Sequence, residues 1–123
     1  EIAETLSSFP GVIEANVYGV EVANTDGRAG MAALVLEQEI DMTALYQYLS
    51  HELATYAIPV FLRIQQEIEI TGTFKHRKVD LVKAGFNLSE IEEPLYFADH
   101  VIGAFVILDD DLYTRIEQGE IRV

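Results

Sequence analysis

Apolar and polar positions in the first part of the chain predict a short helix and then a strand. Ile2, Leu6 and Phe9 have helical spacing, and Pro10-Gly11 ends that helix. Residues 12–22 alternate loosely between apolar and polar side chains and are rich in β-branched residues, which is typical of a strand. We expect this strand to form one half of a β-hairpin.

A turn and an apolar run predict the other half of the hairpin. Asn24-Thr25-Asp26-Gly27 is a turn signal, and residues 30–37 form a nearly continuous apolar run. Such a run is typical of a central strand that is buried on both faces. The second strand is therefore expected to lie inside a sheet.

The middle of the chain predicts a longer helix followed by another strand. Asp41 is a good N-cap for a helix through about Thr55, in which one stripe is apolar: Leu45, Tyr48, Leu49 and Leu53. Residues 60–65, after Pro59, are expected to form a strand, and residues 67–70 can be extended as well.

A loop and a second longer helix come next. The loop covers residues 71–74, and the helix is expected from about His76 to Ala84. Gly85 follows as a natural stop, because glycine readily adopts the left-handed conformation that ends many helices.

The tail is expected to hold short elements only. Residues 94–97 and 104–108 have the composition of short strands, and Asp109 or Asp110 caps a short final helix. The order of elements predicts one α/β (α+β) domain over residues 1–123. Its core would be a small mixed sheet of about three strands plus a hairpin, flanked by helices.

Composition narrows the class of protein. The 123 residues include 50% hydrophobic side chains, carry a formal net charge of -13 and contain no cysteine. The acidic balance weighs against nucleic-acid binding and against adsorption to anionic lipid, and the missing cysteines exclude disulfides and thiolate metal sites. No apolar run reaches the ~20 residues that span a bilayer, and no signal peptide opens the chain, so nothing points to export. The absence of cysteine fits a reducing cytoplasm, and a cytoplasmic location is expected.

The few basic residues are concentrated in one window of the sequence. Residues 61–85 hold five of the eight basic residues but only three acids, the basic ones being Arg63, Lys75, Arg77, Lys78 and Lys83. This window is therefore about +2, whereas the rest of the chain sums to about -15.

Other candidate chemistry is weak. The three histidines lack metal-ligand spacing, and Asp109-Asp110-Asp111 is better explained as acids at a helix start. The glycines of residues 26–30 belong to a turn without a phosphate-loop pattern, and no Walker A motif or dinucleotide fingerprint occurs. We expect no metal site and no nucleotide pocket built by this chain alone.

Lys75 is the candidate functional residue, and two interpretations of it remain open on physical grounds. It can be an ordinary exposed lysine, or it can serve a bound anion. Lysine is a poor choice near a helix N-terminus, where the helix dipole is already positive, and Arg77 and Lys78 add to the repulsion. Thr71-Gly72-Thr73 would give a hydrogen-bonding loop suited to reaching out of the domain.

The segment ITGTFKHRKVDLVKAGF resembles the C-terminal motif of the adenylate-forming enzymes. It is most similar to the branch of fatty-acid transport proteins and very-long-chain acyl-CoA synthetases. Thr71, Thr73 and Lys75 match the Thr, Ser and Lys of the motif. Phe74 replaces its Gly and Lys78 stands where an Arg would be, and both departures are what that branch shows.

The resemblance covers essentially the whole chain. Residues 10–36, 44–64 and 93–123 are similar to that branch's hairpin, helix with strand, and C-terminal extension. It implies a fold like the C-terminal domain of adenylate-forming enzymes, with residues 1–123 as the lid domain of a long- or very-long-chain fatty acid–CoA ligase. Glu1 has no initiator Met or N-cap before it, which also indicates a fragment of a longer protein.

The same resemblance implies the cofactors and the roles of the residues. ATP, Mg²⁺ and the fatty acid would be bound mainly by an N-terminal domain that is absent here, with CoA as co-substrate, so the fragment alone should be inactive. Lys75 would supply the cation for adenylation, and Thr71, Gly72 and Thr73 would carry it. Arg28 or the first helix would border the CoA channel, although Arg28 can equally be a surface turn residue.

Two rival functions remain. One is a stand-alone acidic α/β binding or regulatory module, which an upstream ATP-binding domain in the parent reading frame would exclude. The other is fatty-acid uptake as the main role, in which acylation traps the fatty acid as a CoA ester. Any membrane association would then come from the missing region.

Overall fold

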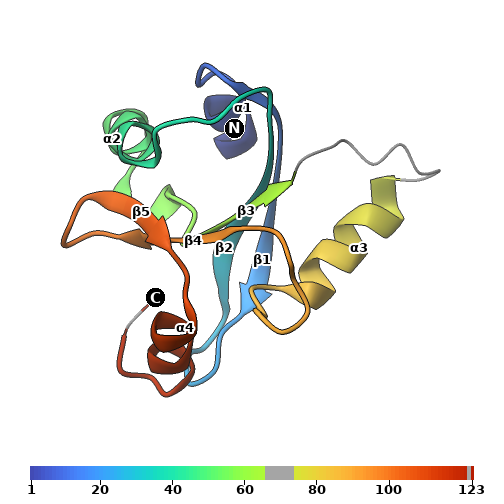
Figure 1. The fold of residues 1–123 in the computed structure, drawn as a ribbon, viewed down its shortest axis with the longest axis vertical. Helices are drawn as coiled ribbons and strands as arrows, with labels where there is room; N and C mark the ends of the chain where they lie inside the picture. The colour runs from blue at the N-terminus through green and yellow to red at the C-terminus, as the bar shows by residue number, and fades with distance from the viewer. Residues whose placement is uncertain (66–73, 122) are drawn as a thin grey trace.

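The computed structural model describes residues 1–65, 74–121 and 123, and for residues 74–78 it describes the backbone only. Figure 1 shows helices arranged on both sides of a central sheet. The elements in these ranges follow the order α1 (Ile2–Ser7), β1 (Val12–Glu21), β2 (Arg28–Leu36), α2 (Met42–Glu52), the 3₁₀ turn η1 (Thr55–Ala57), β3 (Phe61–Gln65), α3 (Phe74–Ala84), β4 (Leu95–Asp99), β5 (Ala104–Ile107) and α4 (Asp110–Glu117).

The five strands form one mixed sheet in the order β1-β2-β3-β4-β5. β1 and β2 are the expected hairpin, antiparallel from Val12 opposite Leu36 to Glu21 opposite Arg28. β2 and β3 are parallel, which requires a crossover connection, and α2 lies in that connection. β4 and β5 continue the sheet in antiparallel fashion. The prediction of a small mixed sheet flanked by helices is confirmed.

Each face of the sheet carries its own hydrophobic core. On one face, Leu6 of α1 and Leu45 and Leu49 of α2 pack on Leu34 and Leu62 of the central strands. On the other face, residues of α3, of the loop after it and of α4 pack on the strand side chains that point to that face. The buried residues of this second core are Tyr18, Val20, Val22, Met31, Ala33, Phe61, Leu81, Phe86, Ile91, Leu95, Phe97, Leu108 and Ile116.

The continuous apolar run of β2 is explained by this two-sided burial. Met31 and Ala33 face the core beneath α3 and α4, whereas Ala32 and Leu34 face the core beneath α1 and α2. All four side chains are at most 2% exposed. The prediction of a central strand buried on both faces is confirmed.

The capping predictions are confirmed, with one boundary corrected. The Asp41 carboxylate accepts hydrogen bonds from the amides of Thr43 (2.9 Å) and Ala44 (3.1 Å), and α2 ends at Glu52 instead of about Thr55. The chain after α2 is already extended at Leu53, because it has to cross to the 3₁₀ turn before Pro59.

The cap of α4 and the end of α3 also agree with the predictions from the sequence. Asp109 caps α4 by accepting a hydrogen bond from the amide of Leu112 (2.8 Å), and Gly85 ends α3 with φ +54°. Helices in the described ranges of the chain fall short of the length and apolar character that crossing a membrane would require.

Candidate functional site

The structure places Lys75 in the first turn of α3, because that helix begins at Phe74. The expected start near His76 was therefore two residues late, which is within the usual margin for a helix boundary. Thr71, Gly72 and Thr73, and the extended segment expected at residues 67–70, lie outside the described residues.

The N-terminal end of α3 is strongly cationic in sequence. Its first turn contains no acidic residue, and Lys75, Arg77 and Lys78 fall within its first five positions. The amides of a helix N-terminus already carry partial positive charge, so these cations repel it and one another. Such an end of a helix is stabilised by a bound anion.

The C-terminal half of α3 is anchored on the sheet. Leu81 is 4% exposed, and Phe86, just past the Gly85 stop, stacks on Phe61 of β3 with ring centroids 4.2 Å apart. Val79, nearer the start of the helix, is 62% exposed. Figure 1 shows that α3 diverges from β1 toward its N-terminal end, so the first turn lies away from the core.

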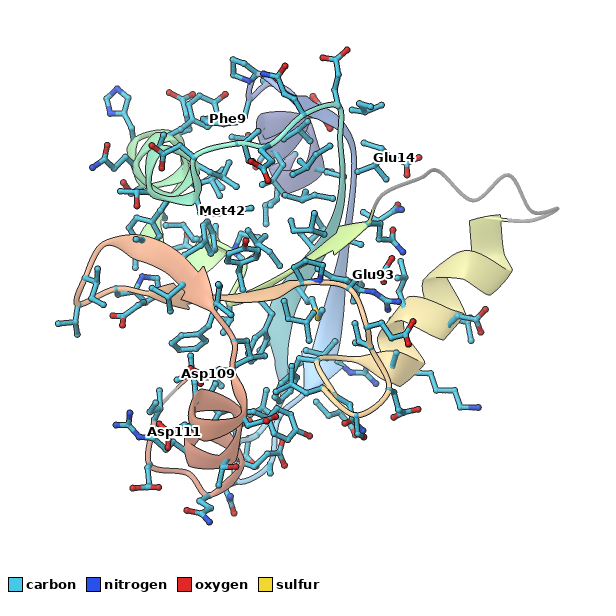
Figure 2. The ribbon with its side chains drawn as sticks, viewed as in Figure 1. Phe9, Glu14, Met42, Glu93, Asp109 and Asp111 are labelled. Atoms are coloured by element: carbon cyan, nitrogen blue, oxygen red, sulfur yellow. The ribbon has the colours of Figure 1, made fainter. Side chains whose placement is uncertain are left out.

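An ion pair lies near the end of the strand that leads toward this segment. Arg63 of β3 donates from Nε to Oε1 of Glu93 at 2.6 Å, with the two side chains 17% and 30% exposed. Figure 2 shows Glu93 on the side of the sheet that α3 covers. This pair was not predicted from the sequence, although an arginine inside an otherwise apolar strand is a signal that a carboxylate lies nearby.

Tyr18 of β1 is close to this pair and is buried. Its hydroxyl oxygen has no hydrogen-bond partner among the described residues, and its side chain is 6% exposed. Burial raises the pKa of Tyr18 to about 12; the charge of Arg63 lowers this pKa and that of Glu93 raises it. A buried hydroxyl without a partner costs stability, since it has lost its hydrogen bonds to water.

Replacing Tyr18 with phenylalanine is therefore expected to raise the free energy of unfolding by about 1 kcal/mol at pH 8. The advantage should grow with pH. An unfolded tyrosine ionises near pH 10 but Tyr18 only near pH 12, so between these values the wild-type unfolded state gains stability that the folded state does not. By linkage, the stability advantage of the phenylalanine variant is therefore about 1.4 kcal/mol larger at pH 11 than at pH 8. Urea unfolding of both proteins at pH 8 and pH 11 measures this, and a difference that does not change with pH would contradict it.

Arg28 lines a cleft at the other end of α3. The cleft has a volume of about 390 Å³, and its walls come from the hairpin, the end of α3 and α4, including Glu21, Lys83, Tyr113 and Glu117. The Arg28 guanidinium donates from Nη1 to the carbonyl of Gly19 at 3.3 Å. Arg28 thus borders a groove, but about 12 Å of helix separates Lys75 from Lys83, so the structure does not bring Arg28 and Lys75 together.

The structure describes the side chains of two of the three histidines. His51 is exposed on α2, and Nδ1 of His100 shares a hydrogen bond with the hydroxyl of Tyr46. Across the described ranges, no three His, Cys, Asp or Glu side chains are grouped so that they could hold a metal ion.

A model of the family named AMP-binding enzyme C-terminal domain matches residues 1–75 of the chain. The chain belongs to this family. The match ends at Lys75, and residues 76–123 of this AMP-binding enzyme C-terminal domain lie beyond it. The resemblance noted in the sequence is confirmed at the level of the family.

The similarity to curated proteins extends over the whole chain. The domain is 43% identical to "Long-chain fatty acid transport protein 6" of Homo sapiens, covering 100% of this chain and 20% of that protein. It is 44% identical to "Long-chain fatty acid transport protein 2" of Rattus norvegicus, covering 94% of this chain and 19% of that protein. The chain thus spans about a fifth of the length of these relatives.

Solved structures confirm the fold. The coronafacic acid ligase from Pectobacterium brasiliense superposes with a TM-score of 0.58 at 22% identity, covering 79% of this chain and 19% of the ligase. The structure titled "ATP bound RpMatB-BxBclM chimera B3" superposes with a TM-score of 0.53 at 22% identity, covering 67% of this chain and 17% of the chimera.

Proposed function

We propose that residues 1–123 are the C-terminal lid domain of a long- or very-long-chain fatty acid–CoA ligase. The parent enzyme would convert ATP, fatty acid and CoA into acyl-CoA, AMP and pyrophosphate. The observation that carries this proposal is the 43% identity to a long-chain fatty acid transport protein across the entire domain. The domain corresponds to only a fifth of the length of that protein. The remaining four fifths of such a protein would bind ATP with Mg²⁺ and the acyl chain.

In the first half-reaction, the fatty acid carboxylate attacks the α-phosphate of ATP and pyrophosphate leaves. Negative charge is redistributed around the phosphate during this in-line displacement, and a preorganised cation lowers the barrier. Lys75 is that cation in our proposal, carried by Thr71-Gly72-Thr73 and the first turn of α3. The divergence of this turn from the sheet supports the role, because it leaves the turn accessible to another domain.

In the second half-reaction, the thiol of CoA attacks the acyl carbon and AMP leaves. The lid would rotate as a rigid body between the two steps, withdraw Lys75 and present a different face to CoA. Arg28 or α1 would border the CoA channel. Lys75 lies at the N-terminal end of α3 and Arg28 beside its C-terminal end. This separation supports such a division of faces, because each residue can contact a substrate without the other.

The proposal is tested by removing the domain. A parent enzyme that lacks these 123 residues is expected to form no acyl-CoA from ATP, a long-chain fatty acid and CoA, while the full chain does. The isolated domain should bind ATP with a Kd above about 1 mM in calorimetry, since it contributes one cation and no phosphate loop. Micromolar ATP binding by the domain, or full activity without it, would contradict the proposal.

Uptake of fatty acids is the second candidate function, and the names of the long-chain fatty acid transport proteins favour it. In the proposed enzyme it needs no separate site, because conversion to a CoA ester traps the fatty acid. We propose a cytoplasmic location for the domain, with any membrane association arising elsewhere in the parent. A stand-alone binding or regulatory module is disfavoured by the family match, since that family is named as one domain of an enzyme.

A further inference from the structure

The turn between β4 and β5 exposes two adjacent aliphatic side chains. Val101 is 98% exposed and Ile102 is 67% exposed. Single exposed apolar residues are common, but tight turns usually carry glycine, asparagine or aspartate at such positions. We call residues 100–103 the hairpin tip. Figure 1 shows that the β4–β5 hairpin projects from the side of the molecule opposite the N-terminal end of α3.

The backbone of the hairpin tip is held in place by its own hydrogen bonds. The Asp99 carboxylate accepts from the amides of Val101 (2.9 Å) and Ile102 (3.1 Å), and the amide of Gly103 donates to the Asp99 carbonyl at 2.8 Å. Gly103 has φ +78°, which closes the turn without strain. Val101 and Ile102 are therefore presented outward by a turn that does not need them.

The base of the hairpin is also fixed. Tyr46 of α2, which is 8% exposed, hydrogen bonds to His100 and makes an edge contact with Phe105, with ring centroids 5.6 Å apart. The hairpin tip thus loses little conformational freedom when a partner covers it, and preorganised contacts of this kind bind at lower entropic cost.

The size of the hairpin tip indicates what kind of partner it fits. Burying one valine and one isoleucine improves an equilibrium constant by roughly 10²- to 10⁴-fold. A separate molecule that binds with a micromolar Kd needs an association constant of about 10⁶ M⁻¹. A partner in the same polypeptide has an effective concentration in the millimolar range, so a contact too small to hold a separate molecule can still shift the balance between docked and free states. Such a contact suits a lid that docks and leaves in every cycle.

Charge weighs against a lipid surface as the occupant. Residues 95–108 contain no lysine or arginine, and the chain carries a net charge of -13, so an anionic bilayer would repel this end of the molecule. The hairpin lies beyond the 1–75 family match, and four fifths of the length of the matched relatives lies outside this chain and could supply a pocket.

We propose that Val101 and Ile102 dock into an apolar pocket of the parent enzyme's own N-terminal domain during thioester formation. This inference rests on the proposed function. The assignment to the second half-reaction follows from the opposite placement of the hairpin and the N-terminal end of α3. When the α3 end is inserted for adenylation, the hairpin tip faces away, and when the lid turns, the tip meets the other domain.

The experiment uses the full-length enzyme carrying Val101→Ser and Ile102→Ser. Thioester formation from synthetic acyl-adenylate and CoA is expected to fall roughly tenfold, because the docked population falls, while pyrophosphate release in adenylation stays within about twofold. The double variant Val101→Leu, Ile102→Leu keeps the apolar surface and should retain the wild-type rate. Ile13→Ser, at an exposed position of the opposite edge strand β1, is the matched control and should change neither step.

The possible results separate this inference from the proposed function. Thioester formation within twofold of wild type in the serine variant would overturn docking while leaving the ligase intact. An equal loss of both half-reactions would also overturn it. If the serine variant kept both half-reactions but no longer bound neutral phosphatidylcholine vesicles, the partner of the hairpin tip would be a membrane and not the N-terminal domain. If it kept both half-reactions but lost a dimer seen in gel filtration, the partner would be a second copy of the chain. A wild-type parent that makes no acyl-CoA would instead refute the proposed function.

Discussion

Replacing Lys75 with alanine in the full-length parent enzyme is expected to lower the rate of acyl-CoA formation by about 10²–10³, or 3–4 kcal/mol. The reason is that a single preorganised cation next to the reacting phosphate is lost, and phosphoryl transfer depends mainly on such positioning and electrostatics. Initial rates at saturating ATP, long-chain fatty acid and CoA measure the effect.

Arg115→Ala is the matched control for Lys75. Arg115 is an exposed cation in the last turn of α4, so its loss changes the net charge by the same amount at a different place. Its rate should stay within about twofold of wild type. If Lys75→Ala and Arg115→Ala had the same small effect, Lys75 would have no specific role in the chemistry.

Replacing Phe61 with alanine is expected to lower the free energy of unfolding by 3–5 kcal/mol, the usual cost of removing a fully buried phenylalanine. Phe61 is 0% exposed, stacks on Phe86 and makes a tilted contact with Phe97 at 5.9 Å. A domain of this size has a total stability of roughly 6–18 kcal/mol. The loss would therefore be a large share of the total, and it would loosen the end of α3 that Phe86 holds.

Urea unfolding measures the Phe61 effect, and Val79→Ala provides its control. Val79 is an exposed apolar residue of α3, the helix whose end Phe86 holds, so its truncation should cost less than about 0.5 kcal/mol. A Phe61→Ala variant that lost under 1 kcal/mol would show that this aromatic stack does not anchor α3.

Local features of the fold could be predicted from the sequence. The caps at Asp41 and Asp109 and the stop at Gly85 depend on hydrogen bonds within a few residues, so the chemistry of each side chain is sufficient. The two-sided burial of β2 could be recognised as well, because its apolar run has no polar face to turn to solvent.

Long-range features could not be predicted from the sequence. The antiparallel addition of β4 beside β3 and the pairing of Arg63 with Glu93 join residues about 30 positions apart, and no periodicity encodes such a choice. The end of α2 was misplaced by three residues and the start of α3 by two, since helix ends depend on where the chain must go next.

The candidate site could be predicted only in part. The motif around Lys75 indicates its chemistry, but the sequence placed the lysine on a loop, whereas the structure has it in the first turn of α3. The position of Arg28 next to the far end of that helix follows from tertiary packing alone. The roles of Lys75, Thr71, Gly72, Thr73 and Arg28 stay predictions.

The comparison of the two half-reactions in Lys75→Ala tests the central claim most directly. Pyrophosphate release in the presence of fatty acid and ATP is measured alongside thioester formation from synthetic acyl-adenylate and CoA. We expect the first rate to fall by about 10²–10³ and the second to stay within about twofold of wild type. Adenylation at the wild-type rate in this variant would contradict the claim that this domain supplies the lysine for adenylation.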